Sequence, residues 1–323
     1  MSMPPRLSRL LPLALTLIGI IPLQADPLKG AKRIVFLGDS ITAGGHFIVF
    51  LESALRSRHP ETQFINLGLP SEGCTGLSEP AHPFPRPNVH TRLDDALSKA
   101  RPDLVFACYG MNDGIYYPFS EERFAQYKKG IATLIEKVDR AGAALILMSS
   151  PPFDPLPLRR KGRLLPKGAK EFSWTKIYEH YDRDVLTRYA SWLVTQEKLP
   201  GVTRVIDLHS ALNNAYRERR KINPEFTVSG DGVHPDQEGH RMIADAIHRA
   251  LYQSGLPDAP REDLRLIGQQ HEIMHAAWLT HVGHQRPGMR RGLPLGEAKA
   301  RAAALRAKQE PPPERRPAGE STP

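Results

Sequence analysis

The feature that most constrains the fold is the alternation, between residues 33 and 252, of short apolar runs with longer amphipathic stretches. The apolar, β-rich runs are residues 33–37, 63–67, 103–109, 143–148 and 203–208. Helical patterns fall between or after them at residues 46–58, 89–100, 121–141 and 174–197. Buried strands separated by helices favour right-handed crossovers into one sheet. We therefore predict an α/β fold: a three-layer α/β/α sandwich with a flavodoxin-like, mostly parallel five-stranded sheet.

The two ends of the chain differ from this middle part. Residues 1–25 combine Arg6 and Arg9 with an apolar stretch and a small residue, Ala25, which is typical of an export signal. A membrane anchor is the alternative, but the apolar run is shorter than the roughly 20 residues that span a bilayer and contains two prolines. We predict a signal peptide over 1–25, a globular domain over 26–255, and a helical then disordered tail over 256–323. The expected location is secreted or periplasmic.

The formal net charge of +9 is spread along the chain. Its densest patch lacks interleaved aromatic residues and consists of Arg159, Arg160, Lys161, Arg163, Lys167 and Lys170. Proteins that bind nucleic acid usually carry a more organised basic face than this one. We therefore expect no nucleic-acid partner. Weak association with an anionic polysaccharide or the envelope surface fits this charge. Cys74 and Cys108 allow at most one disulfide, and both fall in or beside apolar runs, where cysteine is usually a small buried side chain.

In a parallel sheet of this kind the site forms at the carboxyl ends of the strands, and Ser40 follows the first one. Residues 38–42 read GDSIT, so a buried strand turns into a helix whose N–H groups point at the serine. A helix cap alone also explains a serine or aspartate there. Because Thr42 replaces the last glycine of the G-x-S-x-G elbow, an ordinary α/β-hydrolase is disfavoured.

Two later segments carry groups that a serine nucleophile needs. Residues 231–235 read DGVHP, and the spacing lets the carboxylate of Asp231 fold back onto the imidazole of His234. A helix start explains the proline and the acidic residues that follow, but not the histidine. Residues 110–114 read GMNDG, where Asn112 could donate to an oxyanion or simply form a turn.

Together, the blocks GDSIT, NLG (66–68), GMND and DGVHP occur in an order that resembles the SGNH (GDSL-type) hydrolase family. The resemblance implies a flavodoxin-like fold over residues 33–252. It also implies roles: Ser40 as nucleophile, His234 as base and Asp231 as the orienting acid. The oxyanion donors implied are the N–H groups of Ser40 and Gly68 and the side chain of Asn112. In the second block many relatives carry a further glycine closer to the first one than Gly73 is to Gly68. Gly73 therefore remains the alternative to Gly68 as the oxyanion donor.

Residues 271–275 read HEIMH and match the zinc motif H-E-x-x-H, with His281 where the extended motif has a third ligand. Trp278, however, occupies the position at which that motif turns on a glycine. The motif also lies in a short tail without a protease-sized domain around it. We therefore expect a surface helix rather than a catalytic metal site.

These observations predict a secreted serine ester hydrolase that works through an acyl-enzyme and needs no cofactor and no metal. The expected substrate is a small-molecule or glycan ester, with O-acetyl groups on carbohydrate as the first choice. Hydrolysis of lipid or lysophospholipid esters is the alternative within the enzyme class. A non-catalytic carbohydrate-binding or surface module on a hydrolase fold is the alternative of another class.

Overall fold

The computed structural model describes residues 26–307, and the predicted signal peptide and the last part of the predicted tail lie outside that range. Its centre is a five-stranded sheet in the order β2-β1-β3-β4-β7 with every pair parallel. The strands are β1 (Arg33–Gly38), β2 (Gln63–Asn66), β3 (Leu104–Tyr109), β4 (Ala144–Ser149) and β7 (Val202–Ile206). All six residues of β3 are buried, as expected for a central strand covered on both faces. The predicted fold class is confirmed.

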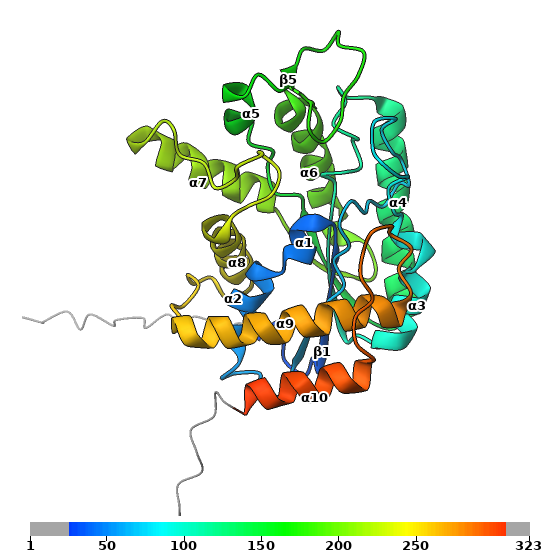
Figure 1. The fold of residues 1–323 in the computed structure, drawn as a ribbon, viewed down its shortest axis with the longest axis vertical. Coiled ribbons are helices and arrows are strands. Elements are labelled where there is room, and N and C mark those ends of the chain that lie inside the picture. The colour runs from blue at the N-terminus through cyan, green and yellow to red at the C-terminus, as the bar shows by residue number, and fades with distance from the viewer. Residues whose placement is uncertain (1–25, 308–323) are drawn as a thin grey trace, which may run out of the picture.

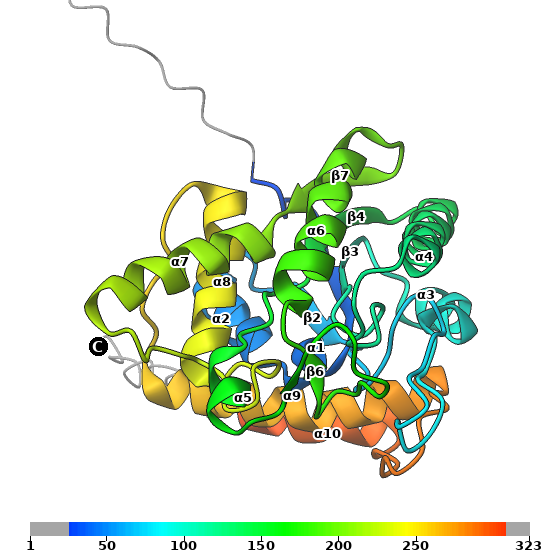
Figure 2. The same ribbon diagram turned by 90° about the horizontal axis from the view of Figure 1, so that it is seen from above.

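Helices cover both faces of this sheet (Figure 2). On one face lie α2 (His46–Leu55), α7 (Leu208–Ile222) and α8 (Gln237–Tyr252), with α2 and α7 each packed against α8. On the other lie α3 (Leu93–Ala100), α4 (Glu121–Arg140) and α6 (Thr187–Val194). The rings of Tyr127 in α4 and Tyr189 in α6 stack with centroids 4.3 Å apart, which joins two of these helices. The predicted three layers are therefore present.

The region from 174 to 197 differs from the single helix that its sequence pattern predicts. Residues 174–181 instead contain the short strand β6 (Ile177–Tyr178), which pairs with β5 (Leu164–Leu165). The Tyr178 N–H donates to Tyr116 O at 3.1 Å, a long-range bond that competes with helix formation. Helical structure begins only at η2 (Asp182–Leu186), a π-helical turn, and continues through α6 to η3 (Thr195–Lys198). Helix α7, in turn, is not among the predicted helices.

The tail forms α9 (Arg261–Val282) and α10 (Leu295–Arg306), which lie across the lower part of the molecule (Figure 1). Helix α9 contacts α2, α3 and the edge strand β2. Trp278, Leu279 and Val282 are buried in the same hydrophobic cluster as the sheet. The tail therefore adds to the main core instead of forming its own. None of the helices within residues 26–307 is long and apolar enough to cross a membrane.

The remaining described elements are short. They are α1 (Ser40–Gly44), η1 (Val89–Thr91) and α5 (Leu156–Arg160). Cys74 and Cys108 are buried free thiols. In register, Phe36 pairs with Asn66 and Gly38 pairs with Cys108, so the strands end at one common edge. The loops that follow them meet there.

Candidate active site

Ser40 is the first residue of α1, immediately after β1 and the capping residue Asp39. The Asp39 carboxylate accepts the Ile41 N–H at 2.9 Å, which fixes the start of the helix. Gly38 leaves room for this turn, because a Cβ there would lie 2.2 Å from Thr42 Oγ1. The Ser40 Oγ consequently faces His234, and the Oγ–Nε2 distance is 2.8 Å.

His234 is connected in turn to Asp231, with Nδ1 2.7 Å from Oδ2. The other carboxylate oxygen accepts the backbone N–H groups of Val233 and His234, at 2.9 and 2.8 Å. The hydrogen bond that His234 donates to Asp231 raises the pKa of His234 above its ordinary 6.5 despite partial burial. Although burial alone acts in the opposite direction, the bonds from His234 hold the pKa of Asp231 below its ordinary value. The three side chains form a continuous relay from carboxylate to hydroxyl.

Asn112 lies at the end of β3 on a buried polar network. Its Oδ1 accepts from Arg86 Nη1 at 2.9 Å and from Tyr116 Oη at 2.8 Å. Its Nδ2 donates to Glu72 O at 2.9 Å. An amide nitrogen carries two hydrogens, and within the described part of the chain Nδ2 makes one bond, so the second N–H can serve a ligand. Because Arg86 and Tyr116 both donate to Oδ1, the amide oxygen and nitrogen of Asn112 cannot be exchanged without losing these bonds.

Arg86 is itself held by Glu79 through two bonds of 2.6 Å, and both side chains are almost fully buried. Neither residue stands out in the sequence, since Arg86 lies in a proline-rich loop with no motif around it. Tyr116 lies two residues after the GMNDG block, but nothing in the sequence shows that its hydroxyl reaches Asn112. Its φ of 63° belongs to a tight turn after Asn112. Buried donors of this kind are recognised only from the tertiary structure.

Asp39 and Asp113 are two further carboxyl groups close to the relay. Asp39 is buried, and desolvation raises its pKa to about 6 despite the Ile41 N–H bond and the nearby His234. Burial also raises the pKa of Asp113, whose Oδ1 accepts the N–H groups of Cys74 and Thr75. Of these two carboxyl groups, Asp39 acts on the relay directly, because its charge raises the pKa of His234 and favours the protonated ring.

The loop after β2 shows a difference from the implied oxyanion donors. The Gly68 N–H donates to Asn66 Oδ1 at 2.8 Å, and the alternative Gly73 N–H donates to Pro87 O at 3.0 Å. Both are therefore already occupied. Gly68 is needed for another reason: a Cβ there would lie 2.3 Å from Ala43 N in α1. Between the two glycines, the Ser71 N–H makes no hydrogen bond within residues 26–307.

The family model for GDSL-like lipases and acylhydrolases matches residues 36–242, which is more than half of the chain and includes Ser40, Asn112, Asp231 and His234. The chain belongs to this family. Membership makes it a carboxylic ester hydrolase, which confirms the predicted enzyme class. No curated protein matches the chain.

Solved structures resemble this GDSL family member in fold. A gut microbial diltiazem-metabolizing enzyme is 19% identical with a TM-score of 0.50, over 70% of this chain and 48% of its own. An acetylxylan esterase from Geobacillus stearothermophilus is 17% identical with a TM-score of 0.47, over 70% and 97%. A GDSL-like lipase from Bacteroides thetaiotaomicron is 19% identical with a TM-score of 0.43, over 71% and 92%.

The HEIMH segment of this GDSL hydrolase lies on α9 and faces the core. His271 Nε2 is 2.7 Å from Glu52 Oε2, and His275 Nε2 is 2.8 Å from Gly68 O. His281 packs edge-on against Trp278, with centroids 5.7 Å apart. Within residues 26–307 no three His, Cys, Asp or Glu side chains are grouped so that they could hold a metal ion. The helix is also less exposed than expected, because His271 is buried.

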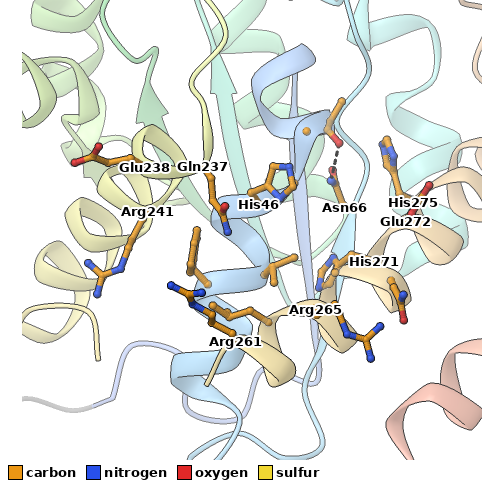
Figure 3. Close-up of a pocket in the computed structure, with 18 of the residues that line it drawn as sticks. His46, Asn66, Gln237, Glu238, Arg241, Arg261, Arg265, His271, Glu272 and His275 are labelled. Atoms are coloured by element: carbon orange, nitrogen blue, oxygen red, sulfur yellow. Dashed lines mark hydrogen bonds between the residues drawn. The ribbon is translucent and has the colours of Figure 1, made fainter. Parts of the chain in front are cut away.

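A groove of about 1260 Å³ opens between α2, α8 and α9 (Figure 3). Its lining includes Arg241, Arg261 and Arg265, but Arg241 pairs with Asp258 and Arg265 pairs with Glu262. The groove reaches the far end of α1, and Ser40 does not line it. It is therefore a neighbour of the relay and not the catalytic pocket itself.

Proposed function

We propose that this GDSL hydrolase is a serine esterase that removes O-acetyl groups from carbohydrate through an acyl-enzyme. The observation that carries the proposal is the relay in which Asp231 orients His234 and His234 contacts the Ser40 hydroxyl. A serine becomes a useful nucleophile only when an adjacent base can take its proton. This arrangement supplies that base at the carboxyl edge of the sheet.

In the first half-reaction, His234 Nε2 takes the Ser40 proton while Oγ bonds to the ester carbonyl carbon. The imidazolium that results is stabilised by Asp231. The tetrahedral intermediate then collapses: the bond to the alcohol breaks and His234 gives its proton to the departing oxygen. In the second half, water attacks the acyl-serine, His234 again accepts and returns the proton, and acetate leaves.

The oxyanion of each intermediate needs donors that are already in place. We assign this role to the Asn112 amide and to the Ser40 N–H, which as the first residue of α1 has no acceptor in its own helix. The bonds from Arg86 and Tyr116 to Asn112 Oδ1 polarise the amide and strengthen it as a donor. Gly68 is not assigned, because its N–H is bonded to Asn66.

The charge around the relay supports a polar substrate. The six basic side chains of segment 151–173 are all exposed. Lys161 Nζ donates to Gly230 O at 2.7 Å, which places this basic segment beside the loop that carries Asp231. Exposed lysines and arginines beside this loop suit an acetylated acidic glycan better than the apolar chain of a lipid. Lipid or lysophospholipid hydrolysis remains the competing activity.

The catalytic role of Ser40 is tested by Ser40→Ala. We expect hydrolysis of an activated acetyl ester to fall at least about 10³-fold, because nucleophilic attack is lost. Thermal unfolding should change little, since the hydroxyl is partly exposed. Ser98→Ala, on the exposed face of α3, is the matched control and should retain full activity. Unchanged hydrolysis in Ser40→Ala would contradict the mechanism.

The substrate class is tested with a series of esters of increasing acyl length and with acetylated acidic and neutral glycans. Acetyl esters should be hydrolysed fastest, and acetate release should be faster from acidic glycans. Rates that rise with acyl length would instead favour the lipid activity. Binding of glycan without any ester hydrolysis would favour the non-catalytic module.

Export is proposed from the composition of residues 1–25. Expression of the full chain in a bacterium followed by N-terminal sequencing tests it. We expect a mature protein in the periplasm or medium that begins near residue 26. Intact Met1 on cytoplasmic protein would argue against export.

A further inference from the structure

The loop formed by residues 66–73, which we call the β2 loop, receives two side chains from the C-terminal region. His275 Nε2, on α9, bonds to Gly68 O at 2.8 Å. Since the partner is a carbonyl, the histidine is the donor. Arg286 Nε, after α9, donates to Pro70 O at 2.9 Å. Both donors come from beyond residue 242, where the match to the family ends.

These two bonds fix the direction in which backbone groups of the β2 loop point. The peptide group between Pro70 and Ser71 is planar and trans, so its carbonyl and its N–H point in opposite directions. Because Arg286 binds the carbonyl, the Ser71 N–H points away from the tail. This N–H donates to no group within residues 26–307. Ser71 also has a φ of 69°, an unfavourable conformation for a residue with a side chain.

Ser71 and Asn112 are also fixed by one common group. Arg86 Nη1 donates to Asn112 Oδ1 at 2.9 Å and lies 3.3 Å from Ser71 O. The next residue, Glu72, accepts the Asn112 Nδ2 with its carbonyl at 2.9 Å. The amide assigned to the oxyanion therefore packs directly on the backbone of the β2 loop. An unpartnered N–H beside it is a further donor for the same charge.

We propose that the Ser71 N–H is the third oxyanion donor and that Arg286 and His275 are positioning residues that hold it in place. The inference rests on the proposed esterase mechanism. It assigns a catalytic purpose to the C-terminal region: His275 and Arg286 help to fix a loop in which Ser71 has an unfavourable backbone conformation. Of the two, Arg286 has the more direct effect, because it binds the same peptide group that carries the Ser71 N–H.

Substitutions at Arg286 test the proposal. Loss of an oxyanion donor costs about 10²–10³-fold in kcat, so a displaced one in Arg286→Met should cost at least about tenfold. KM should stay within about twofold, since the donor acts on the transition state. Arg286→Lys keeps a donor for Pro70 O and should recover most of kcat. Inactivation by a p-nitrophenyl phosphonate, whose adduct on Ser40 is tetrahedral, should slow in parallel with kcat.

Arg306 provides the matched control, because its Nη2 donates to Pro60 O at 2.8 Å, a tail-to-backbone bond away from the relay. Arg306→Met should leave kcat unchanged. An equal loss in Arg306→Met and Arg286→Met would show a general effect of tail docking and overturn the proposal. So would an unchanged kcat in folded Arg286→Met.

His275 gives an independent measurement if Arg286→Met does not fold. His275→Gln places an amide donor near the original Nε2 and should keep most of kcat, whereas His275→Ala should lose it. Equal kcat in both variants would contradict the proposal. Ser40→Ala separates the two levels: if it is active, the esterase mechanism fails, and if it is inactive while Arg286→Met is fully active, only the positioning role fails.

Discussion

At the residue scale, His234 is balanced between opposing effects. The hydrogen bond to Asp231 raises its pKa, partial burial lowers it, and the nearby Asp39 raises it further, so that the pKa lies above 6.5. A base must be neutral to accept a proton, so the enzyme loses activity as pH falls through this pKa. The carboxylate that orients the ring thus also narrows the pH range of the enzyme on the acidic side.

The pH dependence of kcat/KM in Asp231→Asn tests this balance. Removing the carboxylate lowers the pKa of His234, so the acidic limb should move to lower pH than in the parent enzyme. At the same time kcat should fall by about 10³–10⁴-fold, as in other triads that lose the acid. Profiles from pH 5 to 9 measure both effects. Glu238→Gln, which removes a nearby exposed carboxylate, is the control and should leave the acidic limb of the profile unchanged. An acidic limb that does not move in Asp231→Asn would contradict the pairing of Asp231 with His234.

The same scale shows where sequence reasoning succeeded and where it reached its limit. The sequence places Ser40 at a strand end and Asp231 three residues before His234, and the structure brings both side chains within hydrogen-bond distance of His234. Gly68 lies in the loop to which the resemblance assigns an oxyanion donor, but its N–H already has a hydrogen-bond partner in the structure. That partner, Asn66 Oδ1, is supplied by the fold. Arg86 and Tyr116 carried no sequence signal, because their burial arises only from tertiary packing.

At the element scale, α1, which carries Ser40, packs against the β2 loop, which carries the proposed Ser71 donor. Asn66 Nδ2 donates to Thr42 O at 2.9 Å, and Gly68 lies against the α1 backbone. Five strands and most helices follow from periodicity. The segment from 174 to 181 did not, because pairing between β5 and β6 overrides its helical pattern. Long-range pairing is outside what local pattern can predict.

Gly68→Ala tests the α1 contact. An added Cβ would approach Ala43 N to 2.3 Å and Thr42 C to 2.6 Å, and neither backbone atom can move freely. We expect the free energy of unfolding to fall by about 1–3 kcal/mol, as for other overpacked sites, and kcat to fall as α1 shifts. Denaturant unfolding and ester hydrolysis measure the two. Gly168→Ala, where nothing lies within 4 Å, is the control; equal stability of both variants would contradict the close contact.

At the scale of the whole molecule, the tail helices complete the core and cover one edge of the sheet. Strand β2 is an edge strand, and α9 packs against it. Exposed edges of parallel sheets promote association between chains. Trp278, Leu279 and Val282 contribute apolar surface that the sheet alone cannot bury. The tail therefore has a structural function in addition to the positioning role proposed for it.

A chain shortened to residues 26–256 tests this function. Losing three buried side chains at about 1.5–3 kcal/mol each removes roughly 5 kcal/mol or more, comparable with the whole stability of a typical domain. We expect a much lower Tm and aggregation visible by light scattering. A chain that ends at residue 307 keeps every contact described above, so its Tm and its light scattering should equal those of the full chain. A stable, monodisperse 26–256 chain would show that the core does not need the tail.

The bonds from His275 and Arg286 to the β2 loop join residues more than 200 positions apart. A ribosome delivers the nucleophile first, the acid and base much later, and these two donors last. Contacts of such long sequence separation form slowly. The chain should therefore pass through a stage at which the sheet and the relay exist but the loop is not yet held. Full hydrolytic activity would then appear only after the residues of the C-terminal region have been synthesised and have docked on the β2 loop.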